Sequence, residues 1–384
     1  MEELQSYVGN SEIFPILKFV DFFNHAGVSP LPKSAAQAFI DFAFQISSLA
    51  YVQANWHPLI DQTRQIAAEM LNCQKTEIAF IKNTSEGLSI VANGIDWKTG
   101  DRIVTSNVEY PANMYPWMNV VARFGAELVK VEEEADTDGR RVVPLEKILK
   151  AADHDRTRLV ALSHVEFASG QRHDLKSIGA FCRARGILLS IDAIQSMGAV
   201  PVDVAEMSID YLSADGHKWM LAPEGAGIFY CRKELLEKTR PLTIGWMNVV
   251  NAQDFGKYDF TLRADSGRFE CGSHNVPGLL ALRESLRLLH GLGAKAVANR
   301  IKQLGDHLIS GLESKGYAIA SPRSVDQWSG IISFGSPSHS PDAIAATLRK
   351  EHRIELMVRH GRLRAAPHFY NTEAQMDRLV SLLP

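Results

Sequence analysis

The sequence predicts an α/β fold: a large domain with a mostly parallel sheet flanked by helices, followed by a smaller C-terminal α+β domain. Two observations carry this prediction. Between residues 77 and 233, short apolar runs alternate with helical patterns, which is typical of parallel sheets covered on both faces. After about residue 255 this alternation stops. We therefore predict two domains, residues 1–255 with the N-terminal segment and residues 256–384.

The elements follow in chain order from the apolar patterns. Short apolar runs predict strands at 77–83, 101–106, 126–133, 157–165, 187–194, 209–215 and 225–233. Helical patterns fall between them at 84–95, 111–125, 144–153 and 175–186, and the stretch 29–48 contributes a further helix. The second domain has helical patterns at 276–293, 294–316, 341–350 and 372–383, and short strands at 330–336, 354–359 and 361–367.

Composition excludes several classes of protein. The 384 residues are 46% hydrophobic and 22% charged, with a net charge of −3, so we expect no nucleic-acid partner. No apolar run approaches the roughly 18 residues that a membrane span needs, and the start lacks a signal-peptide pattern. Four scattered cysteines form neither a disulfide framework nor a zinc motif, namely Cys73, Cys182, Cys231 and Cys271. We expect a cytoplasmic protein without a metal.

Polar residues gather where the predicted strands end, which is where parallel α/β sheets bind ligands. The run 77–83 leads into Thr84 and Ser85 at a helix start, a place suited either to an anion or to simple helix capping. Other strand ends deliver further polar groups: His164, Glu166, Asp192, Gln195, Ser213, Asp215, His217 and Lys218.

This set of groups suits pyridoxal 5′-phosphate. That cofactor needs an amine for its aldehyde, an anion site for its phosphate, an acid for its ring nitrogen and a face on which to stack. Lys218 could supply the amine as a Schiff-base residue. Taken alone, it could equally be an ordinary loop lysine. The histidines are too scattered for zinc, and neither GxGxxG after a strand nor GxxxxGK[ST] is present.

Two segments resemble a known family. "SIDAIQSMGAVPVDV" (190–204) and "IDYLSADGHKWMLAPEGAG" (209–227) look like the class V, cysteine desulfurase-like branch of fold-type I pyridoxal-phosphate enzymes. The similarity extends from "FFNHAGVSPLP" near the start to "RLRAAPHFYNTEAQMDRLV" near the end. The resemblance implies pyridoxal 5′-phosphate as cofactor, a small amino acid as substrate, and a homodimer whose site is shared across the interface.

The resemblance also implies roles for single residues. Lys218 matches the Schiff-base lysine, Asp192 the partner of the pyridine nitrogen, and Gln195 the neighbour of the phenolic oxygen. The predicted phosphate ligands are Thr84, Ser85 and His217, together with Ser273 from the second subunit. Tyr110 is the predicted stacking ring. Arg364 matches the arginine that binds the substrate α-carboxylate, for which a planar guanidinium is well suited.

Several residues are candidates for the lining of the substrate pocket, each of which could instead be structural. His25 is the one we assign to substrate binding, and the others are Trp117, Trp219, Arg359 and His368.

Three positions depart from the desulfurase pattern. Phe167 stands where desulfurases have an asparagine, and Asp215 replaces a phosphate-binding serine and would repel phosphate unless it points away. Desulfurases also carry a nucleophilic cysteine on a loop before the carboxylate arginine. Here "MVRHGRLRAAP" (357–367) is short and contains no cysteine. A desulfuration that forms a persulfide on the protein is therefore disfavoured.

The reaction at the substrate α-carbon is left open by these residues. The first expectation is an aminotransferase or epimerase acting on a small amino acid. The alternatives are a carbon–sulfur or carbon–selenium lyase and, from "HVEFASGQ" (164–171), a kynureninase-like hydrolase. A non-catalytic scaffold protein is the alternative from a different class, and the joint presence of Lys218, Asp192 and Arg364 argues against it.

Overall fold

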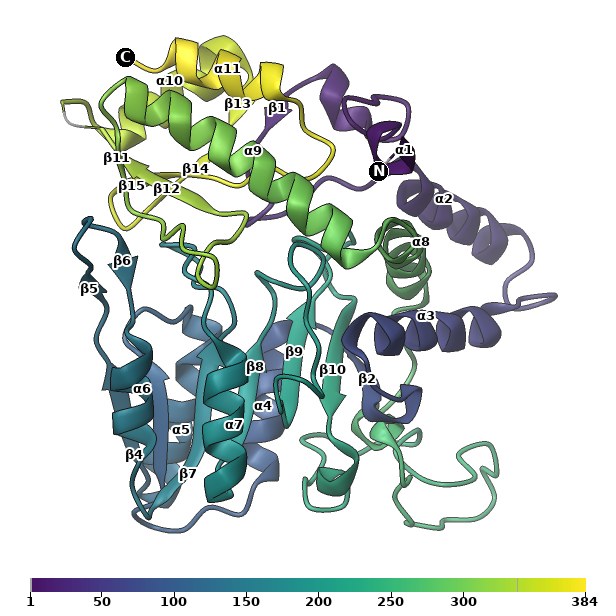
Figure 1. Ribbon diagram of the computed structural model, residues 1–384. Coiled ribbons are helices and arrows are strands. Elements are labelled where there is room, and N and C mark those ends of the chain that lie inside the picture. The colour runs from purple at the N-terminus through teal and green to yellow at the C-terminus, as the bar shows by residue number, and fades with distance from the viewer. Residues whose placement is uncertain (1, 337) are drawn as a thin grey trace.

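A mixed, mostly parallel sheet forms the centre of the computed structural model, which describes residues 2–336 and 338–384 (Figure 1). In spatial order its strands are β2 (Ile78–Ile81), β10 (Gly227–Cys231), β9 (Tyr211–Asp215), β8 (Leu188–Asp192), β7 (Thr157–Ser163), β3 (Arg102–Ser106) and β4 (Glu127–Val131). β10 is antiparallel to both of its neighbours, and the pairs from β9 to β4 are parallel. The carboxyl ends of β2, β9, β8, β7 and β3 therefore meet at one edge, as predicted.

Helices cover both faces of this sheet (Figure 1). α4 (Thr84–Gly94) and α5 (Tyr115–Phe124) lie on one face, and α6 (Leu145–Ala152) and α7 (Leu175–Arg185) lie on the other. Along β7, Leu159 and Ala161 join the apolar cluster of α4 and α5, whereas Val160 and Leu162 join that of α6 and α7. Because successive side chains of a strand point to opposite faces, burial on both sides explains the unbroken apolar runs of the sequence.

Three helices form the flank beside β2. The predicted helix at 29–48 is α2 (Lys33–Ser48), and α3 (Trp56–Leu71), which the sequence analysis did not assign, packs with α2 against α8 (Val276–Leu292). Within α3, the buried residues Ile60, Ala67 and Leu71 lie on one side of the helix. No helix among residues 2–336 and 338–384 has the length and apolar character needed to cross a membrane.

The C-terminal part has its own antiparallel sheet, in the order β11 (Ala318–Ile319), β12 (Ile332–Gly335), β15 (Arg362–Ala365) and β14 (Met357–Arg359). α9 (Ala294–Ser314), α10 (Pro341–His352) and α11 (Glu373–Leu382) pack on it. His360 and Gly361 join β14 to β15, with φ of 46° and 70°. Two residues with positive φ make the tightest hairpin connection, and this fixes the register that places Arg364.

The N-terminal segment pairs with the C-terminal part of the chain. β1 (Asp21–Phe22) is parallel to β13 (Ile354–Glu355), and Asn24 bridges to Ala366. In Figure 1 this segment, with α1 (Glu2–Gln5), lies beside the yellow C-terminal helices, and the hairpin of β5 (Glu134–Ala135) and β6 (Arg141–Val142) approaches the small sheet. The division at residue 255 stays a prediction, although the segment before β2 makes its strand pairing with residues beyond that boundary.

Candidate active site

Lys218 lies in the turn that follows β9, directly above the carboxyl edge of the sheet. Its side chain is buried, with 8% of the residue exposed. Burial lowers the pKa of Lys218 to about 8, Asp192 opposes this effect, and the Arg364 and Arg359 charges add to it. A lysine amine whose pKa lies this close to neutrality is partly unprotonated, and only the unprotonated amine can act as a base or nucleophile.

Asp192 ends β8 and pairs with Ser213 on the neighbouring strand β9, which leads into the turn that carries Lys218. Its Oδ1 accepts a hydrogen bond from the Ile194 N–H at 2.9 Å. Burial raises the pKa of Asp192 to about 6, and the Ile194 N–H and the Lys218 charge limit that rise. Asp192 Oδ2 accepts no hydrogen bond from the described residues. The carboxylate is therefore free to pair with a protonated ring nitrogen.

The start of α4 supports both readings that the sequence left open. Asn83 does the capping, because its Oδ1 accepts from the Glu86 N–H at 2.9 Å. The Thr84 and Ser85 N–H groups belong to the first helical turn, where no intrahelical acceptor exists. The Thr84 hydroxyl accepts from the Asp215 N–H at 3.0 Å. This turn therefore lies beside the lysine segment, with N–H groups and a helix dipole suited to a phosphate.

Both carboxylate oxygens of Asp215 are engaged by neighbouring groups of the protein. Its Oδ2 accepts from His217 Nδ1 at 2.8 Å, and its Oδ1 accepts from the Gly216 N–H at 2.8 Å. The carboxylate is thus paired with the imidazole that the resemblance assigns to the phosphate. The substitution of aspartate for serine at this position orients His217, which is a role that the sequence did not reveal.

The Tyr110 ring faces Lys218, and the Phe167 ring, from the loop after the neighbouring strand, packs against Tyr110. The Tyr110 ring centroid lies 5.4 Å from Lys218 Nζ. The Phe167 ring meets Tyr110 edge to face at 5.2 Å and His360 at 5.4 Å. Tyr110 is 45% exposed, so its ring is accessible for stacking. The position that is asparagine in desulfurases is here part of an apolar wall.

Arg364 approaches from β15 and is held by two neutral acceptors. One guanidinium nitrogen donates to the Phe167 carbonyl at 2.7 Å and another to Asn24 Oδ1 at 3.3 Å. Its Nε is buried and has no acceptor among the described residues. Burial lowers the pKa of Arg364 to about 9, with a further contribution from Arg359, so the side chain is still charged at neutral pH. A buried guanidinium without a carboxylate partner has the charge and the donors to receive an external carboxylate, and the assignment of Arg364 to the substrate stays a prediction.

The side chains of Gln195 and His25 are hydrogen-bonded to other groups of the protein. Gln195 donates to the Ala26 carbonyl at 3.0 Å and accepts from the Trp219 indole at 2.9 Å. The His25 ring lies within 2.7 Å of the Ala366 carbonyl and 2.6 Å of the Tyr370 hydroxyl. Both ring nitrogens of His25 therefore have partners in the protein, and its assignment to substrate binding stays a prediction.

The other candidates for the pocket lining are divided. Trp117 is fully buried against α4 and donates to Asn113, so it belongs to the core. Trp219 and His368 are buried together, with His368 Nε2 at 3.0 Å from the Trp219 carbonyl. Arg359 is partly exposed on β14, and its guanidinium donates to the neighbouring Val358 carbonyl at 2.8 Å.

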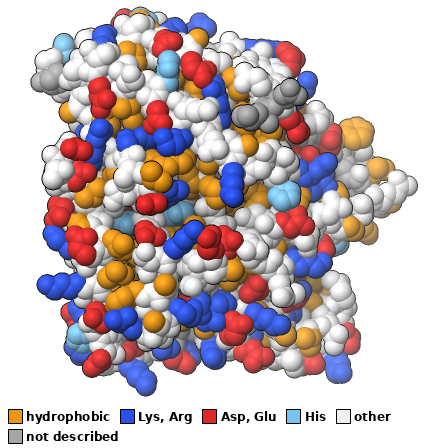
Figure 2. Space-filling view, in the orientation of Figure 1, with side chains coloured by type: hydrophobic (Ala, Val, Ile, Leu, Met, Phe, Trp, Pro, Cys, Tyr) orange, Lys and Arg blue, Asp and Glu red, His pale blue; other side chains and the backbone are white. Residues whose placement is uncertain are grey.

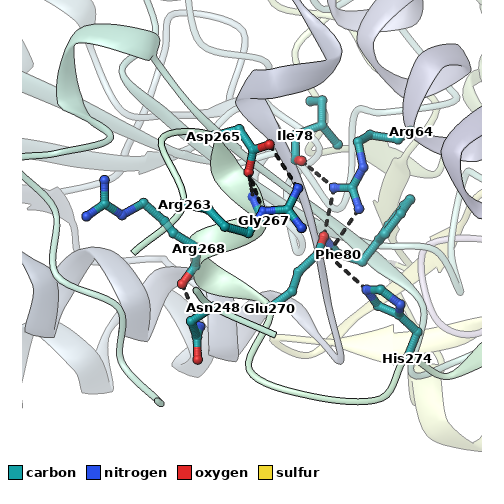
Figure 3. Close-up of polar contacts among 10 residues, drawn as sticks. All are labelled: Arg64, Ile78, Phe80, Asn248, Arg263, Asp265, Gly267, Arg268, Glu270 and His274. Atoms are coloured by element: carbon teal, nitrogen blue, oxygen red, sulfur yellow. Dashed lines mark hydrogen bonds and ion pairs between the residues drawn. The ribbon is translucent and has the colours of Figure 1, made fainter. Parts of the chain in front are cut away.

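Buried charges hold Glu270 and His274 in place (Figure 3), and Ser273 lies between these two residues in the sequence. Glu270 lies between Arg64, whose guanidinium donates to both carboxylate oxygens at 2.7 and 3.0 Å, and His274, at 2.8 Å. Burial alone would raise the pKa of Glu270, but Arg64 and His274 outweigh it and hold that pKa at about 2. Ser273 itself is exposed and lines a cavity of about 110 Å³ with residues at the start of α4, among them Lys82 and Glu86.

All four cysteines are free thiols that differ in burial. Cys182 and Cys231 are buried, and burial raises the pKa of Cys182 to about 12 and also raises that of Cys231. Cys73 is partly exposed, with a pKa that burial raises to about 12. Cys271 is partly exposed in the Ser273 segment. The hairpin before Arg364 contains none of them.

Comparisons with known proteins give a consistent result. The family model described as "Aminotransferase class-V" matches residues 22–379. The chain belongs to the aminotransferase class-V family. A probable cysteine desulfurase of Pyrococcus abyssi is 28% identical to this class-V protein over 391 residues, covering 96% of this chain and 94% of its own.

Solved structures of other class-V proteins share the fold. The apo structure of a cysteine desulfurase from Thermococcus onnurineus NA1 has a TM-score of 0.87 at 26% identity and covers 99% of this chain and 96% of that chain. The cystine C-S lyase C-DES, in complex with its reaction product cysteine persulfide, has a TM-score of 0.87 at 27% identity over 96% of this chain and 98% of that chain. A C-DES mutant with glycine covalently linked to its PLP cofactor has a TM-score of 0.88 at 26% identity, covering 97% and 98%.

These findings confirm the predicted family, the fold, the enzyme class and the cofactor, pyridoxal 5′-phosphate. The residues fit that cofactor, because the buried Lys218, the free Oδ2 of Asp192 and the first turn of α4 lie at one sheet edge. The assignment of single residues to single cofactor atoms stays a prediction. Sequence reasoning missed Asn24, which accepts a hydrogen bond from Arg364, and the buried acid Glu109; it placed Glu166 at a strand end but gave it no role.

Proposed function

We propose that this class-V enzyme is a carbon–sulfur or carbon–selenium lyase. It releases the sulfur or selenium as part of a small-molecule product and does not transfer it to a cysteine of the protein. The observation that carries this proposal is the β14–β15 hairpin. Where desulfurases carry a cysteine loop, this chain has a two-residue turn of His360 and Gly361 that leads directly to Arg364. Relatives named as a cysteine desulfurase and a cystine C-S lyase support lyase chemistry over the aminotransferase or epimerase expected first.

The residues suggest a division of labour in β-elimination. When bound, pyridoxal phosphate withdraws electrons from the substrate α-carbon. Arg364 would bind the α-carboxylate and so orient the Cα–H bond toward Lys218. The unprotonated Lys218 amine would take the Cα proton, and the Cβ–S bond would break with its electron pair leaving on sulfur. Asp192 would keep the ring nitrogen protonated. The sulfur would leave as sulfide or, from cystine, as a persulfide, and the remaining fragment would add one water molecule to give pyruvate and ammonia.

The products decide between this lyase and a desulfurase. With L-cysteine, L-cystine or L-selenocysteine, we expect pyruvate in step with sulfide, persulfide or selenide. Desulfuration would give alanine and a persulfide on the protein. The variant Cys271→Ser should keep the rate of pyruvate formation within about twofold, as expected for a substitution outside the machinery. Alanine formation that disappears in this variant would overturn the proposal, and Cys73→Ser serves as the matched control.

We further propose a homodimer in which Ser273 of one protomer approaches the phosphate site of the other. Ser273 is exposed on a segment that Glu270 fixes rigidly. Exposed apolar side chains also occur in the loop 242–260 and along α2 and the loop after it, which forms the protrusion at the right of Figure 2. Burying such surface is favourable.

Sedimentation should give twice the 42.5 kDa mass of one chain. In the variant Ser273→Ala we expect cofactor affinity to fall by about tenfold, the effect of one lost hydrogen bond to a charged group. Two results together would contradict this proposal: sedimentation as a monomer, and cofactor affinity in Ser273→Ala equal to that of the unmodified protein. The cytoplasm stays the predicted compartment.

A further inference from the structure

Two buried glutamates link the ends of β3 and β7 in a crossed arrangement. Glu109 follows β3, and its carboxyl group accepts from the N–H and hydroxyl of Ser163, at the end of β7, at 2.7 and 2.6 Å. Glu166 follows β7, and its Oε1 accepts from the hydroxyl of Ser106, at the end of β3, at 2.9 Å. Each loop is thus fastened to the strand that carries the other loop.

Both carboxyl groups are out of contact with water. Glu109 is 7% exposed and Glu166 is 1% exposed. Among the described residues no cation pairs with either of them, and Oε2 of Glu166 has no hydrogen-bond partner at all. Two neighbouring buried carboxylates cannot both be ionised without a large electrostatic cost. At least one proton is therefore held by this pair at neutral pH.

The groups around the pair favour the neutral form. Burial raises the pKa of Glu166 to about 8; the Ser106 hydrogen bond opposes this, and the Glu133 and Asp192 charges add to it. Burial and Glu166 raise the pKa of Glu109, against the hydrogen bonds from Ser163 and Asn113. His173, at 3.1 Å from Glu166, and His164 are buried, and burial lowers their pKa values to about 4 and about 3. Both histidines are thus uncharged at neutral pH.

Each glutamate directly precedes a residue of the site. Glu109 is followed by Tyr110, whose ring stands over Lys218. Glu166 is followed by Phe167, whose ring contacts Tyr110 and whose carbonyl accepts from Arg364 at 2.7 Å. A shift of either loop would move the ring wall, and a shift of Phe167 would also move the guanidinium.

We propose that Glu109 and Glu166 are positioning residues, that at least one of these two buried carboxyl groups stays protonated, and that their crossed bonds to Ser163 and Ser106 hold Tyr110, Phe167 and Arg364 in place for the substrate. The inference rests on the proposed function only in that Arg364 receives the α-carboxylate. It does not depend on which bond of the substrate breaks afterwards. Neither glutamate touches the substrate.

The first test uses the variants Glu166→Gln and Glu166→Ala in the cofactor-loaded protein, with glycine as the probe. Glycine has an α-carboxylate but no Cβ, so nothing can be eliminated from it. Its binding, which is measured by the absorbance of the cofactor, is therefore independent of lyase activity. Glutamine keeps a neutral hydrogen-bonding group, and we expect glycine affinity close to that of the unmodified protein. Alanine leaves Ser106 without its acceptor, and we expect affinity to fall by about tenfold. Equal losses in both variants would overturn the proposal.

The second test detects the proton directly. Infrared spectra of the unmodified protein at pH 7 should contain a band of a buried protonated carboxylic acid, which disappears in Glu166→Gln, Glu109→Gln or both. Because the pKa of Glu166 is raised in the folded state, its contribution to stability is complete below pH 4.5 and is lost as pH rises through about 8. The free energy of unfolding should therefore fall less steeply over this range in Glu166→Gln. An absent band together with an unchanged slope would refute the buried protonated carboxyl group, whereas glycine binding without any C–S cleavage would refute only the proposed function.

Discussion

Replacing Lys218 with alanine is expected to reduce turnover of any amino-acid substrate by about 10⁴-fold, because we assign both the covalent anchor and the base to this one side chain. No second lysine is assigned to the site. In the unmodified protein, the unprotonated fraction of Lys218 grows as pH rises through its pKa of about 8. Before cofactor is added, its reactivity toward an aldehyde should increase over the same range.

The measurement combines borohydride reduction with peptide mass analysis. Reduction should fix the cofactor to the peptide that contains Lys218 in the unmodified protein and to no peptide in Lys218→Ala. Lys176→Ala is the control, since Lys176 is exposed and pairs with Glu206 at 2.5 Å on the surface. Full activity in Lys218→Ala, or attachment of the cofactor to another peptide, would contradict the assignment of Lys218 as the cofactor anchor.

Replacing Arg364 with glutamine is expected to raise KM for amino-acid substrates by about 30- to 1,000-fold, with a smaller effect on kcat. Loss of one partner of a buried charge pair costs roughly 2–4 kcal/mol, which corresponds to that range. Arg364→Lys should recover only part of the loss, because an ammonium cannot form the paired contacts of the guanidinium fork. Steady-state kinetics with the best substrate of the panel gives both constants.

A matched control lies two residues away on the same strand. Arg362 is partly buried, and its Nε donates to Ser333 at 3.2 Å instead of to a group of the site. Arg362→Gln should leave KM within about threefold, in the range of ordinary surface substitutions. If both variants raised KM equally, the effect would come from the stability of the small sheet, and Arg364 would lose its assigned role.

Much of the fold could be predicted because its strands are buried on both faces and therefore read as continuous apolar runs. β10 was predicted as a strand, but its antiparallel direction depends on how the segment from 216 to 226 turns, which local pattern does not encode. Helix α3 was missed, although Ile60, Ala67 and Leu71 show the helical spacing in retrospect. The pairing of β1 with β13 joins residues more than 300 positions apart. No local signal announces such a contact.

Those site residues that lie at or just after the end of a predicted strand could be found from the sequence. Lys218 and Asp192 could be found because they follow recognisable strands. The surroundings of Gln195 and His25 could not, since their partners Trp219 and Tyr370 come from distant parts of the chain. Glu109 and Glu166 each precede an aromatic residue at the end of adjacent strands, and this repeated acid–aromatic pair was the available signal.

The pairing between the two ends of the chain has a consequence for how the enzyme is made. His25 meets Tyr370, 345 residues later, and Asn24 meets Arg364, 340 residues later. During synthesis the sheet edge with Lys218 can form well before these contacts, because its strands are complete by Cys231. The contacts of Arg364 and Tyr370 with the N-terminal segment form only after those later residues have been synthesised. If the roles proposed above hold, a nascent chain forms the site for its cofactor before the site for the substrate carboxylate.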